Sequence, residues 1–156
     1  MDKLIQALKI AFASEFNFYL KTHAYHWNVQ GAEFSQYHEL FGNIYEEVYG
    51  SIDVFAENIR KLDALVEVDS INQRSLIQLP QDNLLDIPAM VQVLLGDNDK
   101  MVKLFAMLST PSAGPLANSP NEVVADIEAV TTDAGGGVNG PKHVDDIRVK
   151  DPRGFE

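Results

Sequence analysis

Residues 23–41, HAYHWNVQGAEFSQYHELF, join two long helical patterns. Apolar side chains recur every three to four positions before this stretch, at Leu4, Leu8, Phe12, Phe16, Tyr19 and Leu20. The same spacing returns further on, at Tyr37, Phe41, Ile44, Tyr45, Val48, Ile52, Phe55, Ala56 and Ile59. This spacing gathers apolar residues on one face of a helix, and Gly31 interrupts the two patterns. We therefore predict one helix over residues 3–29 and a second over about 35–65.

The sequence that follows predicts a long connection and a third helix. Apolar residues from Ile71 onward end at Pro80, which is typical of a crossover that contains one brief helix. Asp86 can cap the next helix with Pro88 in its first turn, and the apolar spacing continues to Leu108. Two long helices, a long connection and a third helix predict an all-α fold of the four-helix bundle type.

The C-terminal residues have a different composition. Residues 111–156 hold five of the seven prolines and the run Gly135–Gly136–Gly137. Only residues 121–133 have a helical pattern, and they would span about 18 Å, whereas the other helices reach about 40 Å. Residues 144–149 alternate apolar and charged side chains, as an extended arm does. We therefore expect a helical domain over residues 1–110, and an extension over 111–156 that replaces the last bundle helix and docks on its own bundle or on a neighbouring subunit.

The composition excludes several classes of protein. There are no cysteines, so disulfides and thiolate metal sites are absent. No run of 18 apolar residues could cross a membrane, and the N-terminus lacks the pattern of a secretory signal, so we expect a cytoplasmic protein. A net charge of −11 without a basic cluster makes direct binding to nucleic acid unfavourable.

Three of the four histidines lie close together in the sequence, at His23, His26 and His38. Neutral imidazole is a common metal ligand, but histidines that are hydrogen-bonded inside a bundle are the simpler interpretation of this cluster. Asp53 and Glu57 are four residues apart and so share a helix face, either as metal ligands or as part of a solvated acidic surface.

Distance limits how these groups could combine. Asp53 follows His38 by fifteen residues, which is about 22 Å along one helix, so the two cannot bind one metal within a chain. A twofold axis with antiparallel second helices would bring the acids of one subunit to the histidines of another. The intrachain di-iron site of helical bundles needs Glu-x-x-His, which does not occur here.

The quoted stretch, with YEEVYGSIDVFAENIR at residues 45–60, resembles the signature region of the Dps mini-ferritins of the ferritin-like superfamily. MVQVLLGDNDKMVKLF at residues 90–105 is also similar to that family. The resemblance covers residues 1–110 and implies a ferritin-like bundle. It also implies that His26 and His38 bind iron with Asp53 and Glu57 of the partner subunit, beside Trp27.

The resemblance further implies a homo-oligomer, assembled through the second helix, in which Fe²⁺ is bound between subunits and oxidised, preferably by hydrogen peroxide. The chain departs from the family at Gly42, where an aspartate usually supplies a ligand to one iron position. Glu46, one turn further on, is an alternative carboxylate. We expect weakened or single-metal binding, because one of the two iron positions lacks a ligand.

A second hypothesis is a structural subunit without enzymatic activity. Such a protein would keep the helical hairpin as an assembly surface and use its tail to dock neighbours, for example in a virus particle, which would place it in a virion. Gly42 and the divergent tail favour this interpretation. A role in compacting DNA ranks last because the net charge opposes it.

Overall fold

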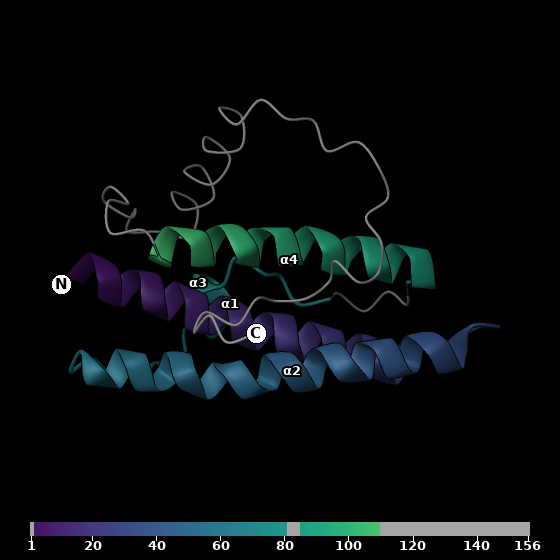
Figure 1. Cartoon of the computed structure of the whole chain (residues 1–156), viewed down its shortest axis with the longest axis horizontal. Coiled ribbons are helices and arrows are strands. Elements are labelled where there is room, and N and C mark those ends of the chain that lie inside the picture. Colours follow the sequence, from purple (N-terminus) through teal and green to yellow (C-terminus); the bar gives the residue numbers. More distant parts are fainter. Residues whose placement is uncertain (1, 81–84, 110–156) are drawn as a thin grey trace, which may run out of the picture.

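The computed structural model of the chain describes residues 2–80 and 85–109. Three long helices, α1 (Asp2–Asn28), α2 (Phe34–Lys61) and α4 (Ile87–Ser109), run along the molecule, and the brief helix α3 (Ile71–Arg74) lies in the connection between α2 and α4 (Figure 1). No strand occurs in these two ranges. The predicted all-α bundle with a long crossover is confirmed.

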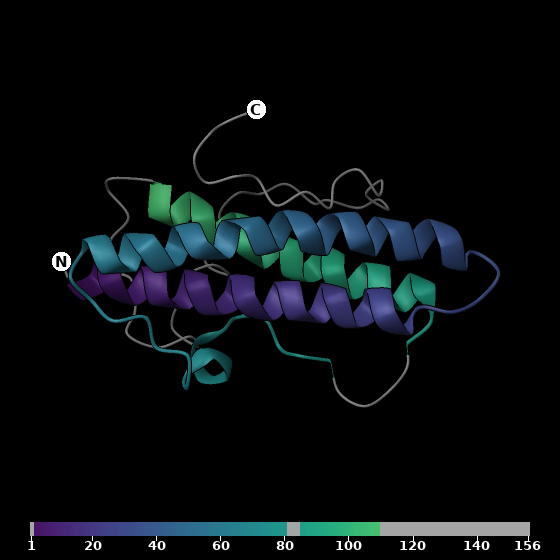
Figure 2. The ribbon, with the colours of Figure 1, turned by 90° about the horizontal axis from the view of Figure 1, so that it is seen from below.

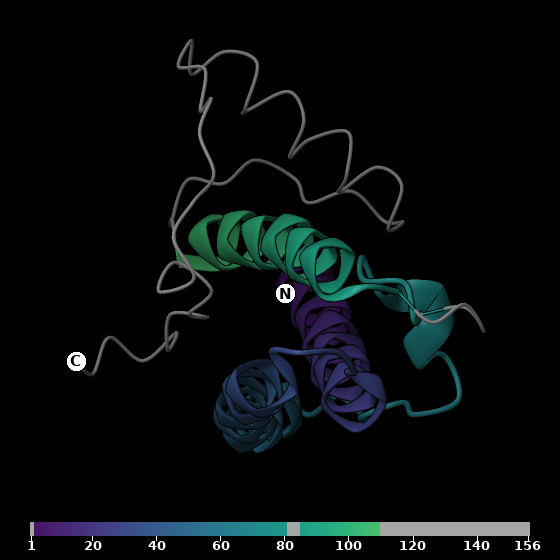
Figure 3. The same cartoon turned by 90° about the vertical axis from the view of Figure 1, so that its right-hand side faces the viewer.

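Helix α1 is the central element of the described structure. It packs against α2, α4 and α3, and the end-on view shows it beside both long neighbours (Figure 3). The view turned by 90° shows α1 and α2 running side by side over most of their length (Figure 2). Thirteen residues of α1 are buried, against five of the longer α2, so α2 leaves far more of its surface open.

The core consists of large apolar side chains contributed by all three long helices. Its fully buried members include Phe18, Phe41, Val48, Ile59, Met90, Leu94, Met101 and Leu104. Phe55 of α2 stacks on Phe105 of α4 with ring centroids 5.2 Å apart. The periodic stripes predicted for α2 and α4 are therefore contact faces of the bundle. On α1, only Phe12 of the predicted stripe is buried and Leu4 is exposed, because the buried face also includes Ala7, Ile10 and Phe18.

Specific end signals fix the lengths of the helices. The side chain of Asp86 accepts a hydrogen bond from the Ala89 amide at 2.9 Å, which confirms the predicted cap of α4. Helix α2 ends at Lys61, four residues before the predicted limit, because Asp63 adopts a φ of 59°. The amide of Ala64 then bonds back to the Ile59 carbonyl at 3.2 Å, which closes the helix end.

Several polar side chains are buried in this core, among them an ion pair and a carboxyl group. Lys21 of α1 pairs with Asp97 of α4, and both side chains are almost fully enclosed. Glu15 of α1 is also buried, and the Ser51 hydroxyl of α2 donates to its Oε1.

Among the described residues, no helix is long and apolar enough to span a membrane. The predicted helix at 121–133, the arm at 144–149 and the docking of the extension lie outside the described residues.

Candidate functional site

His26 lies near the C-terminal end of α1 and His38 near the N-terminal end of α2, and the turn at Gly31 brings them together. Their rings stack with centroids 3.7 Å apart. Nδ1 of His26 is 2.7 Å from the carbonyl oxygen of His38, and Nδ1 of His38 is 2.9 Å from the carbonyl oxygen of His26. Each imidazole therefore bonds to the backbone of the other histidine, which fixes both rings across the hairpin.

This crossed pair of hydrogen bonds decides where the ring protons lie. A carbonyl oxygen can only accept, so Nδ1 of each ring must carry the proton and donate it. In the neutral imidazole, Nε2 then keeps its lone pair. Metal-binding histidines commonly donate their other N–H to a backbone carbonyl in this way, which sets the ring orientation. The pair thus presents two oriented Nε2 atoms whose lone pairs are available to bind a metal ion.

Gly42 lies directly beside this pair. A Cβ at position 42 would meet Cε1 and Nδ1 of His26, each at 3.4 Å. A side chain there would start against the imidazole, so a carboxylate at this position would sit next to the histidines, whereas glycine offers no donor. The alternative carboxylate Glu46 is exposed on α2.

Aromatic rings surround His23, which lies next to the histidine pair. His23 lies between the Tyr45 ring, at 3.8 Å and 11°, and the Trp27 ring, at 3.9 Å. Its Nδ1 is 3.2 Å from the Tyr19 hydroxyl. Burial, and next the nearby His26, lower the pKa of His23 below its ordinary value. Trp27 is 60% exposed, so it is a surface ring beside the site and not part of the core.

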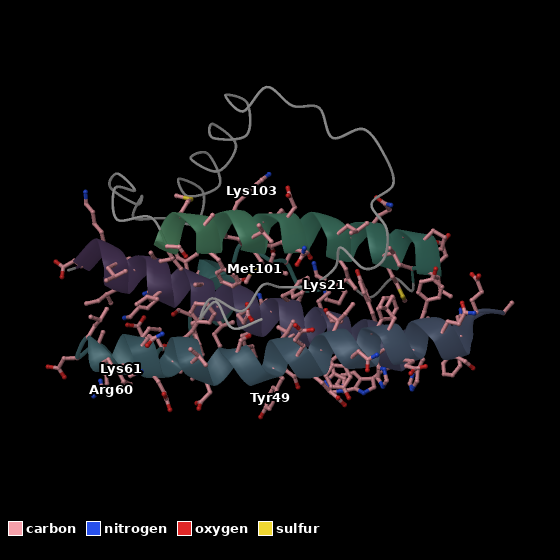
Figure 4. All side chains as sticks on the ribbon, viewed as in Figure 1. Lys21, Tyr49, Arg60, Lys61, Met101 and Lys103 are labelled. Atoms are coloured by element: carbon pink, nitrogen blue, oxygen red, sulfur yellow. The ribbon has the colours of Figure 1, made fainter. Side chains whose placement is uncertain are left out.

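Asp53 and Glu57 lie elsewhere on α2. Both are exposed, and with Ala56, Arg60 and Lys61 they line a shallow, open depression. Because α2 is continuous from Phe34 to Lys61, the fifteen residues between His38 and Asp53 separate them by about 22 Å along its axis. Figure 4 shows Arg60 and Lys61 near the C-terminal end of this helix.

The structure therefore brings the two histidines together but keeps the acids apart from them. Within residues 2–80 and 85–109, no three His, Asp or Glu side chains are placed to hold one metal ion. A single chain offers two nitrogen donors at one end of α2 and two carboxylates toward the other.

Tyr19 and Tyr45 also lie at the site, although no sequence motif predicted them there. Tyr19 precedes His23 by four residues on α1, so their contact follows from helical spacing alone. Tyr45 belongs to α2, and its stacking on His23 depends on the register between the two helices. The residue pattern of α2 alone does not predict its register against α1.

The chain is similar to known proteins over its helical part. The profile of the Ferritin family, a ferritin-like domain, matches residues 5–109. General stress protein 20U of Bacillus subtilis is 39% identical over 62 residues, which are 40% of this chain and 43% of that protein. The DNA protection during starvation protein of Brevibacillus brevis is 46% identical over 41 residues, which are 26% of this chain and 28% of that protein. The chain thus matches less than half the length of these two relatives.

A solved structure extends the likeness to the fold. The Dps protein from Vibrio cholerae O1 has a TM-score of 0.64 with this chain at 26% identity, covering 85% of this chain and 80% of that one. That protein is described as a member of a broad superfamily of ferritin-like diiron-carboxylate proteins. The comparison supports a shared ferritin-like helical fold.

Proposed function

Since this chain belongs to the ferritin-like family, as a Dps-type mini-ferritin, we propose that it binds Fe²⁺ and oxidises it at a site shared by two subunits. The crossed hydrogen bonds of His26 and His38 carry this proposal. They leave two Nε2 atoms as oriented donors, and a pair of imidazoles without anionic ligands is an incomplete iron site.

The missing oxygen ligands are Asp53 and Glu57 of a second copy. These carboxylates are exposed in an open depression, so another molecule can reach them. A twofold axis across α2 would set the acids of each copy against the histidines of the other. Assembly through α2 agrees with the small number of buried residues on this helix. Two equivalent sites would then form per pair of subunits.

The mixed donor set explains the chemistry. Imidazole and carboxylate suit a first-row metal, and hard anionic oxygens favour Fe³⁺ over Fe²⁺, which promotes loss of an electron. Iron is the substrate here, and hydrogen peroxide is the proposed oxidant. Because Gly42 supplies no carboxylate beside His26, we infer one well-formed iron position at each site and a weakened or missing second one.

Co-expression of two defective chains tests whether the site is shared. His26→Ala and Glu57→Ala each abolish iron binding when expressed alone. In a mixed pair, the intact His26 of one chain faces the intact Glu57 of the other, so one site of two is restored. Random pairing makes half of the pairs mixed, which predicts about one quarter of the iron bound by the parent protein. Bound iron is measured by elemental analysis after gel filtration.

Glu47→Ala is the matched control, because Glu47 is another exposed carboxylate of α2 outside the depression. We expect this variant to bind as much iron as the parent. Mixed chains that recover no iron, while both variants fold and assemble, would contradict a shared site. Full iron binding by either single variant would show that the ligands lie elsewhere.

The second hypothesis, an assembly subunit without iron chemistry, is favoured by one observation, the glycine at position 42 beside His26. The relatives described above lend no support to a virion component. Metal content and particle mass separate the two functions. An oligomer that stays free of iron after purification with Fe²⁺ would favour the structural role.

A further inference from the structure

Tyr49 is a large aromatic side chain that α2 holds at the surface of the described structure. It is 62% exposed and projects from α2 on the side away from α4 (Figure 4). Its ring contacts only one side of the hairpin, where the Tyr19 ring of α1 lies 5.2 Å away. Trp27 and Phe34, at the histidine end of the same hairpin, are exposed as well. Aromatic side chains are enriched in the buried centres of protein interfaces, so these rings indicate a surface that a partner covers.

Gly42 is an open position on the same face of α2. It precedes Tyr49 by seven residues, which is about two helical turns, so the two positions lie about 10 Å apart along one stripe of the helix. Among the described residues, a Cβ added at Gly42 would meet only the His26 ring within 4 Å, and the glycine itself is partly exposed. Space therefore remains beside the histidine pair for a side chain of another molecule.

The pairing that would complete the iron site also decides which residues of two α2 helices face each other. If Asp53 of an antiparallel copy lies opposite His38, the twofold axis passes between residues 45 and 46. If Glu57 lies opposite His38 instead, the axis passes between residues 47 and 48. Over this whole range, the partner's Tyr49 lies opposite residues 42–46. The exposed ring of each copy thus meets the turn of α2 that begins with the glycine of the other.

We propose that the partner's Tyr49 packs over Gly42 and against the His26 ring, and that this contact limits each shared site to one iron. The inference rests on the proposed function. The phenol ring fills the space that a carboxylate at position 42 would need, so it closes the second iron position without supplying a carboxylate. The twofold axis repeats the contact, which gives two such tyrosine and glycine pairs per pair of subunits.

This contact accounts for two features that are unfavourable in a single chain. A glycine inside a helix weakens the helix, and an exposed aromatic ring leaves apolar surface in water. Pairing removes the ring of Tyr49 from water. The missing Cβ at Gly42 is what lets another side chain approach the backbone of α2 closely at this point. The two features therefore complement each other across the axis.

The first experiment measures pairing without iron, by sedimentation over a dilution series in the presence of a chelator. Tyr49→Ala leaves a void at each contact, and Gly42→Leu puts a second side chain where the ring must lie. Each should weaken pairing by at least about tenfold. A mixture of the two variants should pair more tightly than either alone, because the leucine of one chain then meets the alanine of the other and one parental contact is kept.

Val68→Ala is the control, because Val68 is also exposed but lies outside α2, and it should pair like the parent. Circular dichroism checks that every variant keeps its helices. A mixture that pairs no better than the single variants would overturn the contact between copies. Tyr49→Ala protein that pairs as tightly as the parent would overturn it too. No iron is present, so this result does not depend on the proposed function.

The second experiment counts bound iron by elemental analysis, at protein concentrations where each variant is paired. Gly42→Asp alone should keep one iron per subunit, because the partner's Tyr49 still occupies the space. Gly42→Asp combined with Tyr49→Ala should bind two. Two irons with Gly42→Asp alone, or one with the double variant, would overturn the limit that Tyr49 sets. A parent that pairs through this contact but binds no iron would refute the proposed function and that limit, and leave the contact standing.

Discussion

At the scale of single residues, Glu15 is a carboxyl group enclosed between α1 and α2. Its Oε1 accepts from Ser51, and its Oε2 has no hydrogen-bond partner in the described part of the chain. Burial raises its pKa from 4.5 to about 7, although the bond from Ser51 acts in the opposite direction. The folded chain therefore holds a proton on Glu15 at pH values where the unfolded chain has released it.

This carboxyl predicts a pH dependence of stability. Between pH 4.5 and about 7, unfolding releases the proton of Glu15, so the free energy of unfolding falls as the pH rises. Glu15→Gln removes the ionisation and should be more stable than the parent at pH 8, by up to about 3 kcal/mol, with a smaller difference at pH 5. Urea unfolding at the two pH values measures this, with the exposed Glu47→Gln as control. Equal stability differences at both pH values would contradict it.

The candidate ligands show what can be predicted residue by residue. His26 and His38 were predicted as ligands because their spacing matches a known motif; the structure places their rings in contact, and their role as ligands stays a prediction. The crossed bonds to each other's carbonyls and the position of Gly42 beside His26 were not predicted. They depend on the path of the turn at Gly31, where φ is 123°, and on the register of two helices that no single-chain pattern encodes.

At the scale of helices, periodicity identified each long element, and on α2 and α4 the apolar stripes are the buried faces, whereas on α1 most of the predicted stripe is only half-buried. The end of α2 was placed too late, since Leu65 continues the apolar pattern while the backbone already reverses at Asp63. The hydrophobic pattern reports burial, but a helix ends where backbone groups find other partners. The ion pair between α1 and α4 was also missed, because Lys21 and Asp97 resemble ordinary surface charges in the sequence.

That ion pair yields a prediction about how α4 is held. Asp97→Leu leaves Lys21 buried without its close partner and should lower the free energy of unfolding by about 3–5 kcal/mol. Adding Lys21→Met should recover most of this loss, because an apolar pair then replaces the buried charges. Urea unfolding of the parent, the single variant and the double variant measures the coupling. A double variant as unstable as Asp97→Leu would contradict this account.

At the scale of the whole molecule, one chain separates its histidines from its acids along a rigid helix, so iron binding and assembly should fail together. Ala56 lies in the depression between Asp53 and Glu57. Ala56→Arg should prevent subunits from pairing through α2 and abolish iron binding, although His26 and His38 are unchanged. Light scattering gives the mass and elemental analysis the iron. Val102→Arg, on the exposed side of α4, is the control. A monomeric variant that still binds iron would contradict the shared site.

Helix α1 begins near the N-terminus and is covered by every later element of the described structure. During synthesis, α1 leaves the ribosome before α2, α3 and α4, the elements that cover its apolar surface in the folded chain. The short turn at Gly31 lets α2 fold back as soon as it emerges, because contacts between neighbouring segments form quickly. Helix α4 comes after the long crossover, so a nascent chain carries a half-covered α1 until synthesis reaches Ser109. During this interval chaperones or sister chains have their best opportunity to bind.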